Sequence, residues 1–109
     1  MTCLREGVVD LPDGRRLGYG EYGARGGKPL LIAHGYPGGR RFDQGQLLKE
    51  LGLWTFVLER PGFGLSDPQP GRKVTDWHAD VAVFAKAFGT DRFAVAGFSA
   101  GAPYALACA

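Results

Sequence analysis

Apolar and polar positions divide the first part of the chain into two strand-like segments. Residues 4–11 and 15–22 alternate loosely between apolar and polar side chains, and Pro-Asp-Gly at 12–14 lies between them. Because proline, aspartate and glycine favour a tight turn, this pattern predicts a β-hairpin. A glycine-rich segment at 23–27 is expected to form the loop that follows.

Three later runs are apolar almost throughout. They lie at 30–33, 53–58 and 93–96, and the last belongs to a strand that we expect from Asp91 to Gly97. A short continuous apolar run is typical of a strand that is covered on both faces, as in a parallel sheet. The three runs therefore predict interior parallel strands.

The segments between these strands carry helix signals. Asp43 and Gln46 have the spacing of a capping box, so a first helix is expected to begin at Asp43 and to end at Gly52. A third helix is expected from Ala100 onward, directly after the fifth strand. The inner face of the first helix is predicted to consist of Leu47, Leu48 and Leu51.

A second helix is predicted by an apolar stripe with steps of four, three and four residues. Thr75 is expected as its N-cap and Gly89 as its end. The hairpin and the alternating strands and helices together predict one α/β domain over residues 1–109, with parallel strands, right-handed crossover helices, about five strands and three helices. The stripe consists of Trp77, Val81, Phe84 and Phe88.

Composition and charge exclude several classes of protein. The chain has 109 residues, of which 45% are hydrophobic and 22% charged, and this suits a soluble globular domain. The net charge is only +2, and the arginines form scattered pairs at 15–16 and 40–41 rather than a stripe, so no nucleic-acid partner is expected. No apolar stretch approaches the ~20 residues of a membrane span, so no membrane partner is expected.

The cysteines and the N-terminus bear on the compartment. Cys3 and Cys108 do not form a disulfide framework, and no cysteine–histidine cluster has the spacing of metal ligands. Charged residues such as Arg5 and Glu6 interrupt the N-terminus, so no signal peptide is expected. We therefore expect a cytoplasmic protein with free thiols, no metal and no cofactor.

A candidate nucleophile follows the fifth strand. Residues 97–101 read Gly-Phe-Ser-Ala-Gly, which fits Gly-x-Ser-x-Gly between an apolar strand and a helix. Gly97 and Gly101 allow a tight turn with the hydroxyl of Ser99 at its tip. The N–H of Ala100, at the start of the helix, favours negative charge on a substrate oxygen. The alternative is an idle serine in a glycine-rich turn.

A candidate oxyanion-hole loop follows the third strand. Residues 34–38 read His-Gly-Tyr-Pro-Gly, and the backbone N–H of Tyr36 is the candidate second donor beside that of Ala100. His34 and Gly35 would shape this loop. Two alternatives remain: His34 is itself the general base, or the loop is a plain turn. The other histidine, His78, is interpreted as a surface residue of the second helix.

Two further glycine patterns do not predict a nucleotide site. Residues 18–23 match Gly-x-Gly-x-x-Gly, but a dinucleotide fingerprint must follow a buried strand and open a helix. Here two arginines precede the pattern, and Gly26 and Gly27 follow it. Lys28 follows those glycines, but Pro29 stands where a phosphate-binding loop has serine or threonine.

Three motifs in order resemble the N-terminal half of an α/β-hydrolase. They lie at 34–38, at 59–67 (Glu-Arg-Pro-Gly-Phe-Gly-Leu-Ser-Asp) and at 97–101. The resemblance covers essentially the whole chain, and three ordered motifs are far more specific than any one. It implies a partial α/β-hydrolase sheet. Glu59 departs mildly from the family, which usually has aspartate there, and this affects support of the site.

The resemblance also implies roles for single residues. Ser99 matches the nucleophile, and Tyr36 and Ala100 match the two backbone donors of the oxyanion hole. His34 and Gly35 match the loop that shapes this hole, where the histidine is structural. Because residue 99 is serine and not aspartate, the resemblance implies ester, thioester or peptide bonds of a small substrate, and not haloalkanes or epoxides.

The family's catalytic acid and histidine come later in the chain than the nucleophile. No such region follows Ser99 here, so the sequence is expected to be an N-terminal fragment or one half of a split enzyme, with little or no esterase turnover alone. The edge at 93–96 would lack a neighbouring strand, so we expect a dimer, aggregation or pairing with a missing C-terminal half. The alternative function is a non-catalytic interaction or remnant domain.

Overall fold

The computed structural model describes residues 3–36, 38–90 and 92–108. Strands β1 (Cys3–Asp10) and β2 (Arg16–Gly23) form the expected antiparallel hairpin. In its turn the Leu11 N–H donates to the Arg15 carbonyl over 2.8 Å, and Gly14 has a φ of 88°. A positive φ is easily adopted only by glycine, so the Pro-Asp-Gly sequence determines where the hairpin reverses.

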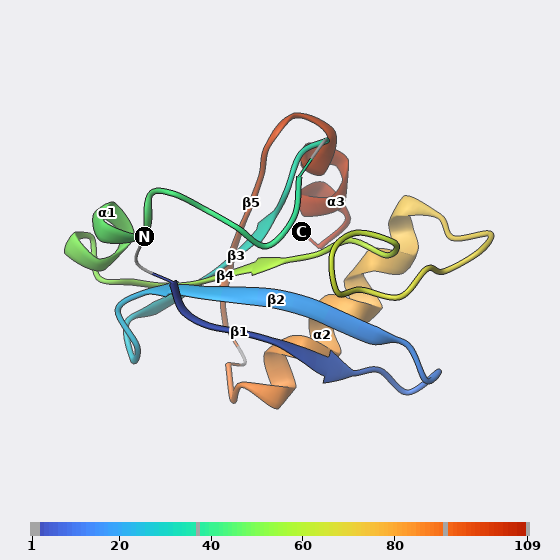
Figure 1. The fold of residues 1–109 in the computed structure, drawn as a ribbon, viewed down its shortest axis with the longest axis horizontal. Coiled ribbons are helices and arrows are strands. Elements are labelled where there is room, and N and C mark those ends of the chain that lie inside the picture. The colour runs from blue at the N-terminus through green and yellow to red at the C-terminus, as the bar shows by residue number, and fades with distance from the viewer. Residues whose placement is uncertain (1–2, 37, 91, 109) are drawn as a thin grey trace.

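The other three strands are β3 (Lys28–Ala33), β4 (Leu53–Leu58) and β5 (Ala94–Gly97). The sheet has the order β1-β2-β4-β3-β5, as Figure 1 shows. β3 is parallel to both β4 and β5, and β2 is antiparallel to β4. This confirms the predicted α/β class, with a hairpin followed by parallel strands. β5 is shorter than predicted, because it begins at Ala94, and Asp91 lies outside the described residues.

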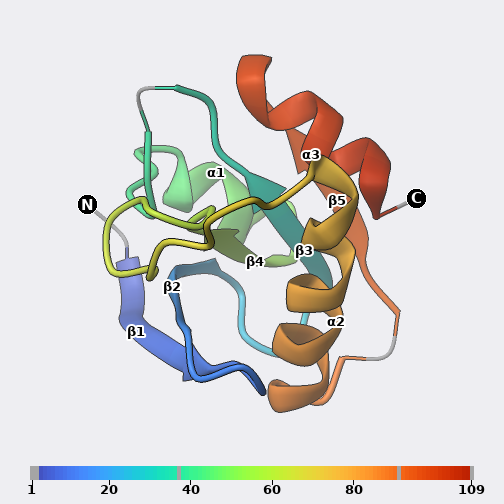
Figure 2. The ribbon, with the colours of Figure 1, turned by 90° about the vertical axis from the view of Figure 1, so that its right-hand side faces the viewer.

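Helices cover both faces of the sheet. Helix α1 (Gly45–Glu50) contacts β2 and β4, whereas α2 (Trp77–Ala87) and α3 (Ala102–Ala107) contact each other. Figure 2 shows α2 and α3 together on one side of the sheet. Two short 3₁₀ turns, Val74–Asp76 and Ser99–Gly101, precede α2 and α3. Within the described ranges, no helix is both long enough and apolar enough to cross a bilayer.

The predicted start and inner face of the first helix are wrong in part. α1 begins at Gly45 with Gln44 as its N-cap, and no side chain caps it, so the capping box of Asp43 and Gln46 does not form. Leu48 is buried, but Leu47 and Leu51 are 50% and 61% exposed. A helix of six residues presents only a short row of side chains to the sheet, and Leu48 occupies that contact.

The predicted N-cap of the second helix is also wrong. Thr75 lies inside the 3₁₀ turn Val74–Asp76, one turn ahead of α2. The capping bond belongs to Lys73, whose backbone N–H donates to the carboxylate of Asp76 over 2.8 Å. The charge of the Asp76 carboxylate strengthens this bond, and the 3₁₀ turn follows Lys73, two residues ahead of the predicted cap.

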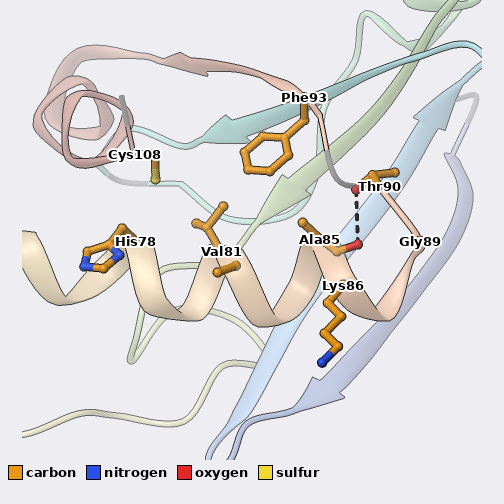
Figure 3. A pocket seen from close by; sticks show the side chains of 9 residues that line it. His78, Val81, Ala85, Lys86, Gly89, Thr90, Phe93 and Cys108 are labelled. Carbon is orange, nitrogen blue, oxygen red and sulfur yellow. Dashed lines mark hydrogen bonds between the residues drawn. The ribbon is translucent and has the colours of Figure 1, made fainter.

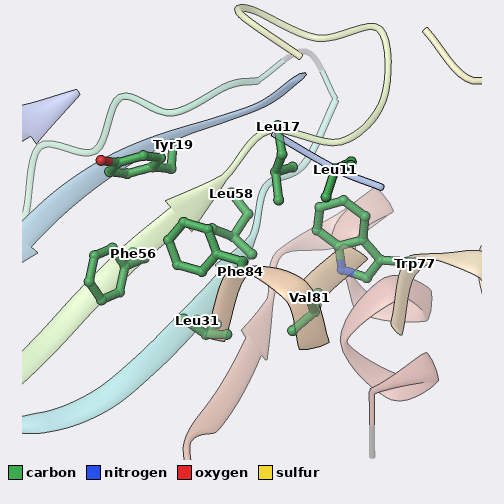
Figure 4. Packing of buried hydrophobic residues seen from close by; sticks show 9 residues of the cluster. All are labelled: Leu11, Leu17, Tyr19, Leu31, Phe56, Leu58, Trp77, Val81 and Phe84. Atoms are coloured by element: carbon green, nitrogen blue, oxygen red, sulfur yellow. The ribbon is translucent and has the colours of Figure 1, made fainter. Parts of the chain in front are cut away.

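The core has two parts, one on each face of the sheet. Alternation along the strands produces this division: Phe56 and Leu58 of β4 face α2, whereas Val57 between them faces the side of α1. The apolar stripe of α2 packs as predicted, with Phe84 fully buried (Figure 4). The larger cluster consists of Leu11, Leu17, Tyr19, Leu31, Phe56, Leu58, Trp77, Val81 and Phe84.

Candidate active site

The three sequence motifs meet at one edge of the sheet. β4, β3 and β5 are neighbours and run parallel, so the segments that follow them lie side by side at their carboxyl ends. Two hydrogen bonds join these segments: Arg60 N–H donates to His34 Nε2 over 3.1 Å, and Phe98 N–H donates to the Ala33 carbonyl over 3.2 Å. Pro37, in the first of these segments, lies outside the described residues.

Ser99 stands on a sharp bend between β5 and α3. Its φ is 49°, and among the described residues it is the only one other than glycine with a positive φ. The Gly101 N–H donates to the Phe98 carbonyl over 2.7 Å and closes the bend. An L-residue adopts this conformation at a cost in backbone strain, which is retained where the surrounding structure requires it. The bend leaves Ser99 exposed at the tip.

The glycines on either side of Ser99 allow the close approach that makes this bend. A Cβ at Gly97 would lie 2.6 Å from the Gly101 carbonyl oxygen and 2.8 Å from the Ala102 Cα. A Cβ at Gly101 would overlap the Ala33 carbonyl oxygen and lie 2.5 Å from that of His34. Because these neighbours are backbone atoms, they cannot move aside as a flexible side chain can. The backbone of the bend therefore packs directly against the backbone at the end of β3.

The loop after β3 passes beside Ser99. A Cβ at Gly35 would lie 3.7 Å from Ser99 Cβ and 3.1 Å from the Phe98 carbonyl oxygen. Tyr36 is 74% exposed, and its N–H has no acceptor among the described residues. The N–H of Ala100, in the first turn of a helix, likewise has no partner within that helix. The N–H groups of Tyr36 and Ala100 thus belong to the two segments that meet at Ser99.

His34 is buried beneath this loop, with 4% of its surface exposed. Its Nε2 accepts the Arg60 N–H, so Nδ1 carries the proton and donates to the Gly35 carbonyl over 2.7 Å. Burial lowers the pKa of His34, and the charge of Arg60 lowers it further, against the opposing effects of the Gly35 bond and Glu59. Both ring nitrogens are occupied, so neither can accept a proton from Ser99 in this arrangement.

Glu59 connects the loops behind the site. Its carboxylate is buried and accepts the Arg40 N–H over 3.0 Å and the Leu65 N–H over 2.8 Å. The Arg40 guanidinium pairs with it at 3.3 Å. A Cβ at Gly64 or Gly18 would overlap this carboxylate. Sequence reasoning identified Glu59 as a supporting residue, but its partners come from distant loops and carry no local signal.

Sequence reasoning missed the part played by Arg60. This residue is 5% exposed, and its Nη2 donates to the Gly35 carbonyl over 3.2 Å. Its guanidinium lies 4.8 Å from the centre of the Phe63 ring and 4.6 Å from that of Tyr104. Its position directly after β4, within the motif at 59–67, was the one available signal.

Two cavities differ in their relation to Ser99. A cavity of about 190 Å³ is lined by His34, Gly35, Phe42 and Phe98, next to the bend. A larger one of about 620 Å³ lies between α2, β5 and the end of α3, bounded by Val81, Phe93 and Cys108 (Figure 3). None of the residues at the bend lines the larger cavity.

Within the described ranges, no group of three or more His, Cys, Asp or Glu residues is placed to hold a metal ion.

Comparison with known proteins identifies relatives of the chain. A proline iminopeptidase from Xylella fastidiosa (strain Temecula1 / ATCC 700964) is 34% identical over 113 residues, which cover 100% of this chain and 36% of the relative. The chain thus spans about a third of the length of the curated relatives that it matches.

Solved structures show the same arrangement of elements. A predicted CIB-like hydrolase from Thermoplasma acidophilum superposes with a TM-score of 0.83 at 19% identity, over 99% of this chain and 56% of that one. Epoxide hydrolase A from Mycobacterium thermoresistibile superposes with a TM-score of 0.75 at 26% identity, over 89% and 32%. The family described as "alpha/beta hydrolase fold" matches residues 28–109. With its strand order and its serine-bearing bend, the chain therefore belongs to the α/β-hydrolase fold family.

Proposed function

We propose that the protein is a serine hydrolase in which Ser99 is the nucleophile. The observation that carries this proposal is the positive φ of Ser99 at the end of a parallel strand, with the Gly35 backbone alongside. A turn of this kind presents a hydroxyl to a substrate while the start of the next helix faces the same place. The N–H groups of Tyr36 and Ala100 are the proposed donors to the oxyanion.

The proposed reaction is acyl transfer. The Ser99 oxygen attacks the substrate carbonyl carbon, its proton passes to a base, and the carbonyl oxygen becomes an oxyanion held by the two N–H groups. The leaving group then takes a proton and departs, and water hydrolyses the acyl-enzyme. A serine suits ester, thioester or peptide bonds of a small molecule, and the name of the relative, proline iminopeptidase, supports the peptide among these.

The base is proposed to lie outside these 109 residues. The chain has two histidines. Both ring nitrogens of His34 are in hydrogen bonds, and His78 lines the cavity beside α2 that the bend does not reach. We therefore propose that a histidine and an acid come from a longer or a separate polypeptide, and that these residues alone turn over little ester.

A phosphonylating probe with an external base tests the role of Ser99. The chain is treated with a fluorophosphonate, with and without imidazole, and the adduct is located by mass spectrometry. We expect labelling of Ser99 that increases with imidazole, because imidazole can take the proton that a histidine would take. Ser66, the other serine of the chain, is buried and serves as an internal control.

The Ser99→Ala variant at the same imidazole concentration gives the background. If Ser99→Ala is labelled as strongly as the unaltered chain, or if labelling does not depend on imidazole, Ser99 is not the nucleophile. That result would favour a non-catalytic interaction domain on the same scaffold.

The cytoplasm stays the proposed compartment, since Cys3 and Cys108 are free thiols.

A further inference from the structure

The Gly35 carbonyl and the Tyr36 N–H belong to the same peptide unit. A trans peptide is planar, so its carbonyl and its N–H point in opposite directions. Any group that fixes the direction of this carbonyl therefore also fixes the direction of the N–H. If Tyr36 is an oxyanion donor, the residues that hold the Gly35 oxygen control its aim.

Two side chains hold this oxygen. His34 Nδ1 donates to it over 2.7 Å from the adjacent residue, and Arg60 Nη2 donates over 3.2 Å from a loop 25 residues away. The bond from His34 is local and moves with the loop. The bond from Arg60 ties the loop to the end of β4, and so to the rest of the sheet.

The guanidinium of Arg60 is itself held in place by two aromatic rings. The rings of Phe63 and Tyr104 both lie close to it, with their centres 4.8 and 4.6 Å from Arg60 Cζ. Tyr104 belongs to α3, the helix that begins directly behind Ser99. Phe63 also meets the His34 ring at 4.8 Å, edge to face. Arg60 thus joins the loop with the candidate donor to the helix behind the candidate nucleophile.

The charge of Arg60 is not neutralised by a near carboxylate. No ion pair within 4.0 Å involves Arg60 among the described residues, and its Nε is buried without a hydrogen-bond partner there. A buried cation keeps a stronger field than an exposed one, because less water screens it. Such a field at the Gly35–Tyr36 peptide favours negative charge on a substrate oxygen.

We propose that Arg60 is a positioning residue for the oxyanion hole, acting through the Gly35–Tyr36 peptide. The proposal rests on the proposed function, because Tyr36 must be an oxyanion donor. Arg60 does not contact the reacting atoms in this role. It sets the direction of the Tyr36 N–H and adds a positive potential behind it.

The first test measures the direction of this N–H bond without any reaction. Residual dipolar coupling of the Tyr36 N–H and the ¹³C shift of the Gly35 carbonyl are recorded for the ¹⁵N,¹³C-labelled chain, for Arg60→Met and for Arg60→Lys. We expect Arg60→Met to change both, with an upfield carbonyl shift from the lost hydrogen bond, and Arg60→Lys to restore part of the change. Arg72→Met, which removes an exposed arginine, is the matched control.

The second test measures the rate of Ser99 phosphonylation in the presence of imidazole. We expect Arg60→Met to lower the maximal labelling rate at least about tenfold, while the probe concentration at half-maximal rate stays unchanged, because the oxyanion develops only during reaction. Tyr104→Leu removes one of the two aromatic rings that contact the Arg60 guanidinium, and it should also lower the maximal labelling rate. This second variant keeps the test valid if Arg60→Met does not fold.

An unchanged Tyr36 coupling together with an unchanged labelling rate in Arg60→Met would overturn the proposal. Failure of the proposed function and failure of the proposed role of Arg60 give different results. If the unaltered chain is not labelled at Ser99, the proposed function fails, and the dipolar coupling still decides whether Arg60 directs the Tyr36 N–H.

Discussion

The conformation of the bend depends on single residues whose backbones make close contacts. Ser99 keeps a positive φ because Gly97 and Gly101 let two chain segments meet where any Cβ would collide with backbone. The sequence predicted this bend because glycine at both flanking positions is a local signal. It did not predict the role of Arg60, because that role depends on rings and a carbonyl from three different segments.

The variant Gly101→Ala tests this contact. Gly101 has a φ of −80°, which alanine adopts easily, so any loss arises from the collision with the Ala33 and His34 carbonyl oxygens alone. We expect the free energy of unfolding to fall by about 2 kcal/mol, measured by urea denaturation. Ala100→Ser adds an atom at the exposed neighbouring position and should change little. Equal stability of Gly101→Ala and the unaltered chain would contradict the packing described.

The burial of His34 predicts how stability depends on pH. Its pKa in the folded state lies below the ordinary value of 6.5, so near and below that pH the unfolded chain binds more protons than the folded one. The free energy of unfolding should therefore be highest above about pH 6.5 and should fall as the pH falls. Protonation would also turn Nε2 into a donor facing the Arg60 N–H, which is a donor too.

Urea denaturation at a series of pH values measures this dependence. The His34→Gln variant should lose the part of the slope that begins near pH 6.5, whereas His78→Gln, at an exposed position of α2, should keep it. A slope in this range that is the same in all three proteins would show that His34 is not its source.

At the scale of elements, the long periodic pattern predicted structure well and the short one did not. α2 carries its stripe over three turns, and Trp77, Val81 and Phe84 are buried as expected. α1 has six residues, and two of its three expected inner leucines are exposed. Over so short a helix, the contacts with β2 and β4 decide which side faces the sheet.

An ion pair fixes α2 against the hairpin. Arg15, in the hairpin turn, donates to both carboxylate oxygens of Asp80 over 3.1 and 2.8 Å, and their side chains are only 13% and 7% exposed. Because Asp80→Ala would leave this arginine buried without its main partner, we expect a loss of about 3 kcal/mol in thermal or urea unfolding.

The control for this pair uses the same arginine. Asp13 also contacts Arg15, at 2.7 Å, but its side chain is 52% exposed and water screens the pair. Asp13→Ala should therefore leave stability nearly unchanged. A loss of stability in Asp13→Ala as large as in Asp80→Ala would contradict the importance given to burial.

At the scale of the whole molecule, β5 ends the sheet, and a cavity of about 620 Å³ lies beside it. Val81, Ala85 and Phe93 give this cavity an apolar wall, and Thr90 closes one end through its bond to the Ala85 carbonyl (Figure 3). Sheet edges with open backbone groups template association. Self-association through this edge stays a prediction of the sequence.

Sedimentation velocity at tens of micromolar tests it. We expect the unaltered chain to sediment as a dimer or larger species, and Ala94→Lys to shift it toward the monomer, because a charge on an edge strand opposes pairing. Ala94 is exposed, so the lysine should not disturb the core. Ala79→Lys, at an exposed position of α2, should leave the distribution as it is. A monomeric unaltered chain would contradict the prediction.

The pairing of β3 with β5 has a consequence for the newly made protein. Its partners, such as Leu30 and Ala94, are more than sixty residues apart, and the contact of Gly35 with Ser99 depends on the same pairing. Contacts this distant along the chain form late, after the cost of closing a long loop has been met. During synthesis on the ribosome, the serine would therefore acquire its surroundings only after nearly all of these residues had emerged.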